Sequence, residues 1–322
     1  MRRRDVLLSG VAAPLLARAA GAQSESRKVL IGWLATGNTI PLPYFQDAMM
    51  RLGWIEGRNL AVERRITGHD PARRAQAIAE LVALRPELIV TGGATDALPL
   101  RAVTRDIPIV VIGGTDLIEA GLVESLARPG GNVTGLTVLG RELDGKRLEL
   151  VRELLPNATR VSMLGNQAQR MTQPRLDAAE VIARSLSLSL VRRMAAQPAE
   201  LDAVFATVAA DKDQAILIPF NALTFEDRPR IITLAAKFGL PAIYEFGEFV
   251  KDGGLMSYGA IYRDYFERAA ILADKIIRGV KPADLPVEQP TRFELAINLK
   301  AAKHLGLAVP QTLLARAEEV IE

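Results

Sequence analysis

Several polar, glycine and aromatic residues occur directly after sequence runs that are typical of buried strands, at positions where loops are expected. At such positions glycine lets a backbone approach a ligand closely, and hydroxyl, amide and carboxylate groups can hold the ligand by hydrogen bonds. The set consists of Thr36, Asn38, Gly93, Thr95, Thr115, Asp116, Asn166, Phe220, Asn221, Tyr244, Glu245 and Tyr258. Because ligands of open parallel sheets bind beyond the carboxyl ends of the strands, these residues are predicted to gather around one small molecule.

Each residue type in this set suggests a different contact. The threonine hydroxyls could donate hydrogen bonds to a carboxylate, and Asp116 or Glu245 could pair with an ammonium group. The three aromatic rings could stack on an aromatic group or cover an apolar one. Few aromatic residues lie near the candidate loops, so a smaller or aliphatic acid also fits the sequence.

The sequence lacks the residues on which several kinds of site depend. It contains no cysteine and only two histidines, which excludes disulfides and thiolate ligands and disfavours a histidine metal site. No GxSxG elbow marks a serine nucleophile, and no GxGxxG follows a strand pattern. We therefore expect no metal, no cofactor and no enzymatic activity. The pair Asp116 and Glu245 keeps one alternative open, an exported enzyme that uses them as acid and base.

The segment Gly140–Arg147 has the GxxxxGK spacing of a phosphate-binding loop. Its last residue is an arginine, where the motif needs a Ser or Thr hydroxyl for Mg²⁺, and acidic side chains occupy the loop that should expose bare amides. The segment is therefore interpreted as the capped start of a helix.

The positive charge of the chain is confined to its beginning. The net charge is +3, and residues 1–22 account for it with four arginines against one aspartate. The rest of the chain has equal numbers of basic and acidic residues. A nucleic-acid-binding body needs a basic face, so nucleic acid is not an expected partner.

The first 22 residues have the three parts of an export signal. A run of arginines precedes the apolar stretch Val6–Leu16, and Ala20-Gly21-Ala22 supplies the small residues that signal peptidase requires. Residues 1–22 are therefore predicted to be a signal peptide, with either a twin-arginine or a Sec route. The mature chain is expected in the periplasm, without a lipid anchor because there is no cysteine, and soluble because no later segment offers a membrane span.

The remaining sequence alternates strand-like and helix-like patterns and predicts an α/β protein with two doubly wound parallel-sheet lobes joined by a hinge. The predicted strands are Lys28–Ala35, Asn59–Arg65, Glu87–Thr91, Ile107–Ile112, Arg160–Gly165, Ser187–Arg192, Gln214–Ile218 and Pro241–Ile243. Residues 28–133 plus 254–286 are assigned to lobe 1, and residues 134–253 plus 287–322 to lobe 2. Three crossings between lobes make a hinge, which is suited to closing on a ligand.

Five stretches carry a resemblance to a known family. They are Ala127–Gly135 (ARPGGNVTG), Gly145–Leu150 (GKRLEL), Pro290–Lys300 (PTRFELAINLK), Arg51–Gly57 (RLGWIEG) and Leu313–Arg316 (LLAR). Together they resemble the ABC-transporter substrate-binding proteins of the tryptophan/tyrosine type, and the resemblance covers nearly the whole chain. It implies the type I periplasmic-binding fold.

The resemblance also implies a function and partners. It implies a monomeric periplasmic receptor that captures an amino acid, an aromatic compound or an organic acid between two lobes. The receptor would deliver it to an ABC importer, whose permease and ATPase subunits are the expected partners. Besides the exported enzyme, a second alternative is a ligand-sensing subunit that reports to a membrane receptor.

Overall fold

The computed structural model describes residues 28–37, 42–68, 70–113, 116–167, 169 and 172–322. The predicted signal peptide and the candidate residues Asn38 and Thr115 lie outside the described residues. In the part that is described, no helix is long and apolar enough to cross a membrane.

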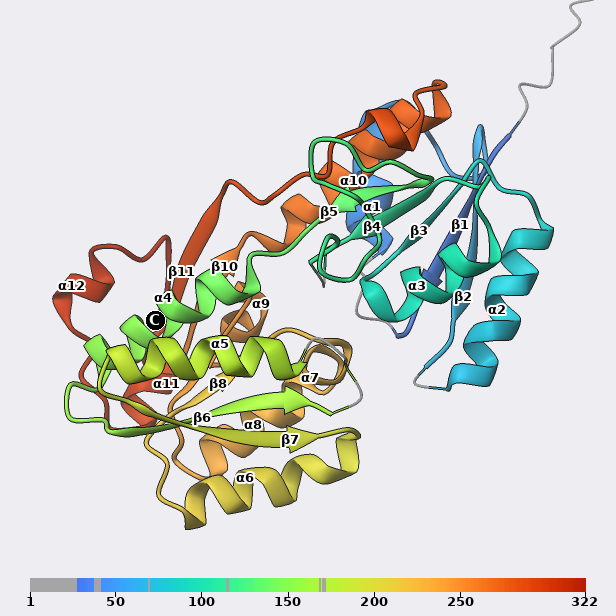
Figure 1. Cartoon of the computed structure of the whole chain (residues 1–322). Coiled ribbons are helices and arrows are strands. Elements are labelled where there is room, and N and C mark those ends of the chain that lie inside the picture. Colours follow the sequence, from blue (N-terminus) through green and yellow to red (C-terminus); the bar gives the residue numbers. More distant parts are fainter. Residues whose placement is uncertain (1–27, 38–41, 69, 114–115, 168, 170–171) are drawn as a thin grey trace, which may run out of the picture.

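The first lobe is built on a five-stranded parallel sheet in the order β2-β1-β3-β4-β5 (Figure 1). Its strands are β1 (Val29–Ala35), β2 (Leu60–Ile66), β3 (Leu88–Thr91), β4 (Ile109–Ile112) and β5 (Val133–Leu136). Its helices are α1 (Leu42–Arg51), α2 (Pro71–Ala83), α3 (Ala94–Val103) and α10 (Tyr262–Ile277). Helices α1 and α10 pack together on one face of the sheet, and α2 and α3 lie on the other. The apolar run of β1 fits this position because a strand covered on both faces is buried throughout.

The second lobe is built on a seven-stranded sheet in the order β12-β11-β10-β9-β8-β6-β7. Its strands are β6 (Arg160–Asn166), β7 (Ser189–Ala195), β8 (Ile216–Ile218), β9 (Ala242–Tyr244), β10 (Met256–Ala260), β11 (Phe293–Asn298) and β12 (Glu319–Ile321). Its helices are α4 (Gly140–Leu154), α5 (Thr172–Ser185), α6 (Leu201–Ala210), α7 (Ala222–Glu226), α8 (Arg228–Lys237), α9 (Gly247–Lys251), α11 (Leu299–His304) and α12 (Gln311–Leu314), with short 3₁₀ turns at Pro198–Glu200 and Pro282–Asp284. All the pairs are parallel except β10 with β11.

Two strands belong to a different sheet from the one expected. Strand β10, which was expected in the first lobe, pairs with β9 and β11 of the second sheet, and only α10 returns to the first lobe. Strand β5 lies wholly in the first sheet, paired with β4, so that lobe extends past residue 133. An apolar strand pattern indicates that a strand is buried, but it does not indicate which neighbouring strands supply the hydrogen-bond partners. The expected placement of these two strands was wrong for this reason.

Strand β5, just before the first crossing, requires a glycine at its third position. Gly135 has a φ of +148°, and a Cβ atom there would lie 2.2 Å from the carbonyl oxygen of Val111 on the neighbouring strand. Only glycine permits this backbone and this close approach. The ARPGGNVTG stretch thus ends at a residue that the sheet itself needs.

Helix α4 begins at Gly140, as the interpretation of the GxxxxGK segment predicted. Its N-cap residue, Leu139, provides no side-chain hydrogen bond, so the expected cap is missing. Lys146 pairs with Glu149 one turn further along, at 2.7 Å. The side chains of Asp144 and Arg147 on the same helix are fully buried, and they return below as part of the site.

Candidate ligand-binding site

Two adjoining hollows lie where the carboxyl ends of the two sheets face each other. The first is lined mainly by the second lobe, with Asp116 and Glu119 from the first lobe. The second is smaller and is lined by both lobes. Gln169, Phe220 and Asn221 line both hollows, which therefore form one continuous cleft.

Most of the predicted residues that the structure describes do line this cleft. Those on its walls are Thr36, Gly93, Thr95, Asp116, Asn166, Phe220 and Asn221. Three others, Tyr244, Glu245 and Tyr258, line neither hollow. The rule that ligands lie beyond the ends of parallel strands thus located the cleft but not every side chain in it.

Thr36 lines the cleft, but its hydroxyl is already used. It donates to the carboxylate of Asp96, with distances of 2.9 and 3.1 Å to the two oxygens, and Arg74 donates to Asp96 at 2.8 Å. Burial raises the pKa of Asp96 above its ordinary value, although Arg74 and Thr36 oppose that change. Thr36 is therefore part of the wall, held by a buried carboxylate that the sequence analysis did not single out.

Backbone capping accounts for two more of the predicted polar residues, Asn221 and Asp116, and Asn166 is hydrogen-bonded to the first of them. Asn221 caps α7 by accepting from the amide of Thr224 at 3.1 Å, and its Oδ1 also accepts from Asn166 at 3.4 Å. Asp116 accepts from the amides of Ile118 and Glu119 at 2.9 and 3.0 Å. These side chains are held rigidly around the first hollow, which reduces the entropy lost when a ligand is bound.

A buried network of four charged residues forms part of the wall of the first hollow. Asp144 accepts from Arg147 at 2.6 Å and from Arg175 at 2.6 and 2.8 Å. Arg175 also donates to Glu245 at 2.8 Å, and Arg147 lies 3.9 Å from Glu245. Two arginines thus balance two carboxylates. Only Arg175 reaches the surface of the hollow, with 19% of its side chain exposed.

Glu245 does not have the role that the sequence suggested. Burial by itself would raise its pKa, but the attraction of Arg175 and Arg147 and the amide of Phe220 hold that pKa below its ordinary value. The amide of Phe220 donates to Glu245 at 2.8 Å. The carboxylate is therefore ionised and fully engaged with these residues, so it is not placed to pair with a ligand ammonium or to transfer protons.

The two tyrosines that were predicted as ligand contacts are packing residues. The ring of Tyr244 stacks on Phe249 with centroids 4.6 Å apart, and burial raises the pKa of Tyr244. The ring of Tyr258 stacks on Phe293 at 6.5 Å. In a strand, alternate side chains point to opposite faces of the sheet, so a residue near a strand end can point away from the cleft.

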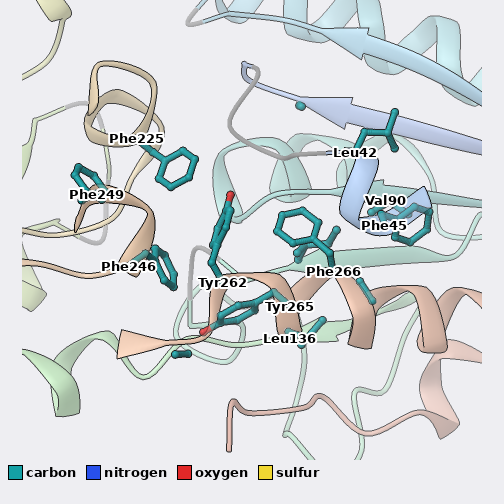
Figure 2. Packing of buried hydrophobic residues seen from close by; sticks show 14 of the residues in the cluster. Leu42, Phe45, Val90, Leu136, Phe225, Phe246, Phe249, Tyr262, Tyr265 and Phe266 are labelled. Carbon is teal, nitrogen blue, oxygen red and sulfur yellow. The ribbon is translucent and has the colours of Figure 1, made fainter. Parts of the chain in front are cut away.

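The sequence analysis missed most of the aromatic residues in the cleft. Phe246, Tyr262, Tyr265 and Phe266 line the second hollow together with Phe220. Figure 2 shows Tyr262 between the second-lobe rings of Phe225 and Phe246 and the first-lobe ring of Phe266. The spacing of Tyr262 and Phe266 is also that of the buried stripe of a helix, so periodicity alone does not mark them as cleft residues. A signal was present, because Tyr262 begins a helix directly after strand β10 and Phe266 lies one turn further along the same face.

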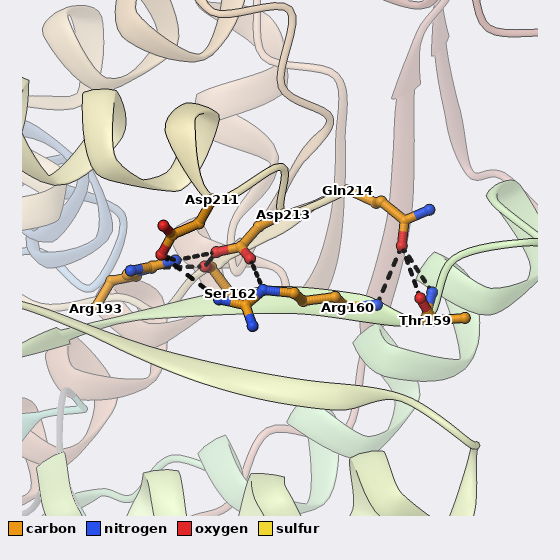
Figure 3. Close-up of polar contacts among 7 residues, drawn as sticks. All are labelled: Thr159, Arg160, Ser162, Arg193, Asp211, Asp213 and Gln214. Atoms are coloured by element: carbon orange, nitrogen blue, oxygen red, sulfur yellow. Dashed lines mark hydrogen bonds and ion pairs between the residues drawn. The ribbon is translucent and has the colours of Figure 1, made fainter.

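The other dense polar cluster lies at the opposite end of the second sheet (Figure 3). There the buried carboxylate of Asp213 accepts from Arg160, Ser162 and Arg193. Burial would raise the pKa of Asp213, but these partners hold it below its ordinary value. Arg160 begins β6, whereas Asn166 at the end of the same strand lines the cleft. This cluster ties strands β6 and β7 together and does not reach the ligand-binding cleft.

Comparison with known proteins decides the family. The family model described as ABC transporter substrate binding protein matches residues 43–321. The chain belongs to this family. The members of the family are binding proteins and not enzymes, which agrees with the engaged state of Glu245. Among the residues that the structure describes, no group of His, Cys, Asp and Glu side chains is arranged to hold a metal ion.

Individual relatives agree with this assignment to the substrate-binding family. A tyrosine-binding protein of Clostridioides difficile is 26% identical over 82% of this chain and 75% of its own length. An ABC domain from Streptococcus pneumonia, solved in complex with L-Trp, is 24% identical with a TM-score of 0.84, covering 91% of this chain and 100% of that one. A conserved domain protein from Vibrio cholerae is 26% identical with a TM-score of 0.84, covering 92% and 99%. The predicted type I periplasmic-binding fold is confirmed.

Proposed function

We propose that this substrate-binding protein holds an aromatic amino acid between its two lobes in the periplasm and delivers it to an ABC importer. The observation that carries the proposal is the aromatic lining of the second hollow. Five rings, those of Phe220, Phe246, Tyr262, Tyr265 and Phe266, surround it and come from both lobes. A hollow of this kind favours a flat apolar group over the smaller or aliphatic acid that the sequence also left open.

The geometry of the rings supports an aromatic ligand. Phe220 meets Phe246 edge-to-face with centroids 4.9 Å apart, and Tyr262 lies 5.1 Å from Phe266, also edge-to-face. Such pairs are individually worth about 0.5–1.5 kcal/mol beyond the area they bury. A ligand ring placed among them makes the same kind of contact with several rings. An aliphatic chain gains only the free energy of burying its apolar area.

The relatives support the same class of ligand. One is named a tyrosine-binding protein, and another was solved with L-Trp bound. The chain also superposes better on that L-Trp complex, with a TM-score of 0.84, than on a ligand-free, open substrate binding protein from Clostridium difficile, with a TM-score of 0.65. This difference supports an arrangement in which the lobes close over a ligand.

Export and delivery are the remaining parts of the proposal. The signal-like residues 1–22 support secretion of the mature chain, which would work as a monomer in the periplasm. Membership of the ABC substrate-binding family supports a permease and an ATPase as the partners. In this proposal the facing sides of the two lobes hold the ligand, which leaves the outer surfaces of both lobes for docking on a permease.

Ligand binding is tested by calorimetry on a chain that begins at Gln23. Tryptophan, tyrosine and phenylalanine are compared with leucine and aspartate, and we expect only the aromatic amino acids to bind. At 100 times its Kd a ligand adds roughly 2.7 kcal/mol to the free energy of unfolding, so a thermal-shift measurement checks the same result. Preferential binding of leucine or aspartate contradicts the proposal.

Delivery is tested by uptake. Cells of the native host that lack this protein are expected to take up the labelled ligand more slowly, and addition of the purified protein to spheroplasts should restore uptake. Unchanged uptake, together with altered activity of a membrane sensor, supports the ligand-sensing alternative instead.

A further inference from the structure

Arg175 lines the first hollow, and two N–H groups of its guanidinium are not used in the hydrogen bonds of the buried network. Its Nε and Nη2 atoms donate the three hydrogen bonds to Asp144 and Glu245 already described. A guanidinium carries five N–H groups in a rigid fork, so the two on Nη1 remain. Among the residues that the structure describes, none accepts a hydrogen bond from Nη1, although Arg175 lines the hollow.

This guanidinium is fixed in place before any ligand arrives. Burial would lower the pKa of Arg175, but the attraction of Asp144 and Glu245 raises it, so the group stays charged. It also packs against Gly140 at the start of α4, where a Cβ atom would lie 3.1–3.4 Å from the guanidinium atoms. A donor held on several sides loses little freedom when it binds an anion, and a planar fork suits a carboxylate.

Glu245 links Arg175 to the aromatic part of the cleft. Its Oε2 atom accepts from Nη2 of Arg175 and from the amide of Phe220, each at 2.8 Å. The guanidinium and Phe220 are therefore separated by one shared oxygen, and both line the first hollow. The ring of Phe220 also lines the second hollow. A ligand whose ring rests against Phe220 in the second hollow can extend a polar end toward Arg175 in the first.

We infer that Nη1 of Arg175 receives the carboxylate of the ligand and makes the site selective for amino acids over the corresponding amines. This inference rests on the proposed function and adds the residue that binds the carboxylate of the ligand. The sequence analysis assigned that contact to threonine hydroxyls, but Thr36 is committed to Asp96. Thr95 lines the second hollow and not the first, where Arg175 lies. The four charged residues of the network balance one another. Three further carboxylates, those of Asp116, Glu119 and Glu142, also line the first hollow, and Arg175 is the one cationic residue among its described lining residues. A carboxylate that enters this hollow therefore has Arg175 as its cationic partner there.

The test compares acids with amines of the same side chain by calorimetry on the mature chain. The pairs are tryptophan with tryptamine, tyrosine with tyramine, and leucine with isoamylamine. Loss of a charge-assisted contact should weaken binding roughly ten- to hundredfold, so tryptamine and tyramine are expected to bind that much less tightly than their acids. Equal binding of an acid and its amine overturns the inference and leaves the aromatic proposal standing.

Substitution of Arg175 provides the second arm. Arg175→Lys keeps a cation for Asp144 and Glu245 but loses the fork, so tryptophan should bind roughly tenfold or more weakly while tryptamine changes little. Arg184→Lys on the exposed side of the same helix is the matched control and should leave both affinities unchanged. A thermal unfolding curve for each variant establishes that it is folded, and an undiminished preference for the acid in folded Arg175→Lys overturns the inference.

The two proposals fail in different ways. If leucine binds, isoamylamine does not, and no aromatic compound binds, the aromatic proposal is wrong and the carboxylate inference holds. If no compound in the panel binds at all, both are wrong.

Discussion

The ring of Tyr262 lies 4.9 Å from the ring of Phe225, centroid to centroid, although the two residues belong to different lobes. Tyr262 begins α10, which packs on the first sheet, and Phe225 lies in α7 of the second lobe. Through this contact and those of Phe220 and Phe246, one apolar cluster runs from the core of the first lobe into the core of the second. The wall of the cleft is therefore also part of the core.

Replacing Tyr262 tests this double role. Tyr262→Ala removes a ring that is 5% exposed and leaves a cavity between the lobes, so it should lower the free energy of unfolding by about 3–5 kcal/mol. Tyr262→Phe keeps the ring and should cost much less. Urea denaturation of the ligand-free chain measures both, and equal losses for the two variants would contradict a packing role.

Phe220 is expected to contribute to affinity more than to stability. It lines both hollows and is only partly buried, so Phe220→Ala should weaken binding of an aromatic ligand roughly tenfold or more. Phe238→Ala is the matched control, because that ring packs on the same apolar cluster outside the cleft. Calorimetry should show an unchanged Kd for Phe238→Ala, and a similar change in both variants would count against the assigned cleft.

The stability of the protein should depend on the ionisation of Glu245. Its pKa is lowered in the folded state, so its contribution is present above the unfolded pKa of about 4.3 and is lost as the pH falls through the folded value. We expect the free energy of unfolding to fall below about pH 4.3, and to fall less steeply in Glu245→Gln. Urea titrations between pH 3 and pH 7 measure this slope.

Glu245→Gln should also be unstable at neutral pH. It leaves the buried Arg147 and Arg175 without one of their two carboxylates, and breaking a buried pair in this way costs about 3–5 kcal/mol. Glu149→Gln breaks the exposed pair with Lys146 and should change stability by less than about 1 kcal/mol. A Glu245→Gln variant as stable as Glu149→Gln would show that the network is dispensable.

Lys146 should be irrelevant to ligand binding, despite its place in a GxxxxGK segment. Its ammonium pairs with Glu149 on the outer side of α4 and lines neither hollow. Lys146→Ala should therefore bind the ligand like the unsubstituted protein, and neither form should bind ATP in calorimetry. Loss of ligand binding in Lys146→Ala would require the cleft to be reassigned.

The mature protein is expected to begin at Gln23. Mass spectrometry of the protein purified from the periplasm of the native host should show loss of residues 1–22. An intact chain found in the cytosol would contradict the export part of the proposed function.

The sequence by itself determined the architecture and the location of the cleft. Apolar runs of strand length alternating with helical stripes specify parallel sheets, and the ends of parallel strands gather at one edge whatever the side chains are. That is why Gly93, Asn166 and Asn221 were placed in the cleft without knowledge of a single contact. The stretches that resemble the substrate-binding family independently indicate the same fold.

Only the tertiary structure decided which side chains the ligand can reach. Glu245 and Arg175 lie 70 positions apart in the chain, and their pairing removes one predicted contact and creates an unpredicted one. Tyr244 and Phe246 are two residues apart, yet one stacks within the core and the other lines the cleft, because the chain turns out of β9 between them. Strand β10 likewise belongs to the second sheet because its hydrogen-bond partners are β9 and β11. Periodicity is a property of neighbouring residues, whereas charge pairing, side-chain direction and sheet order depend on residues that only folding brings together.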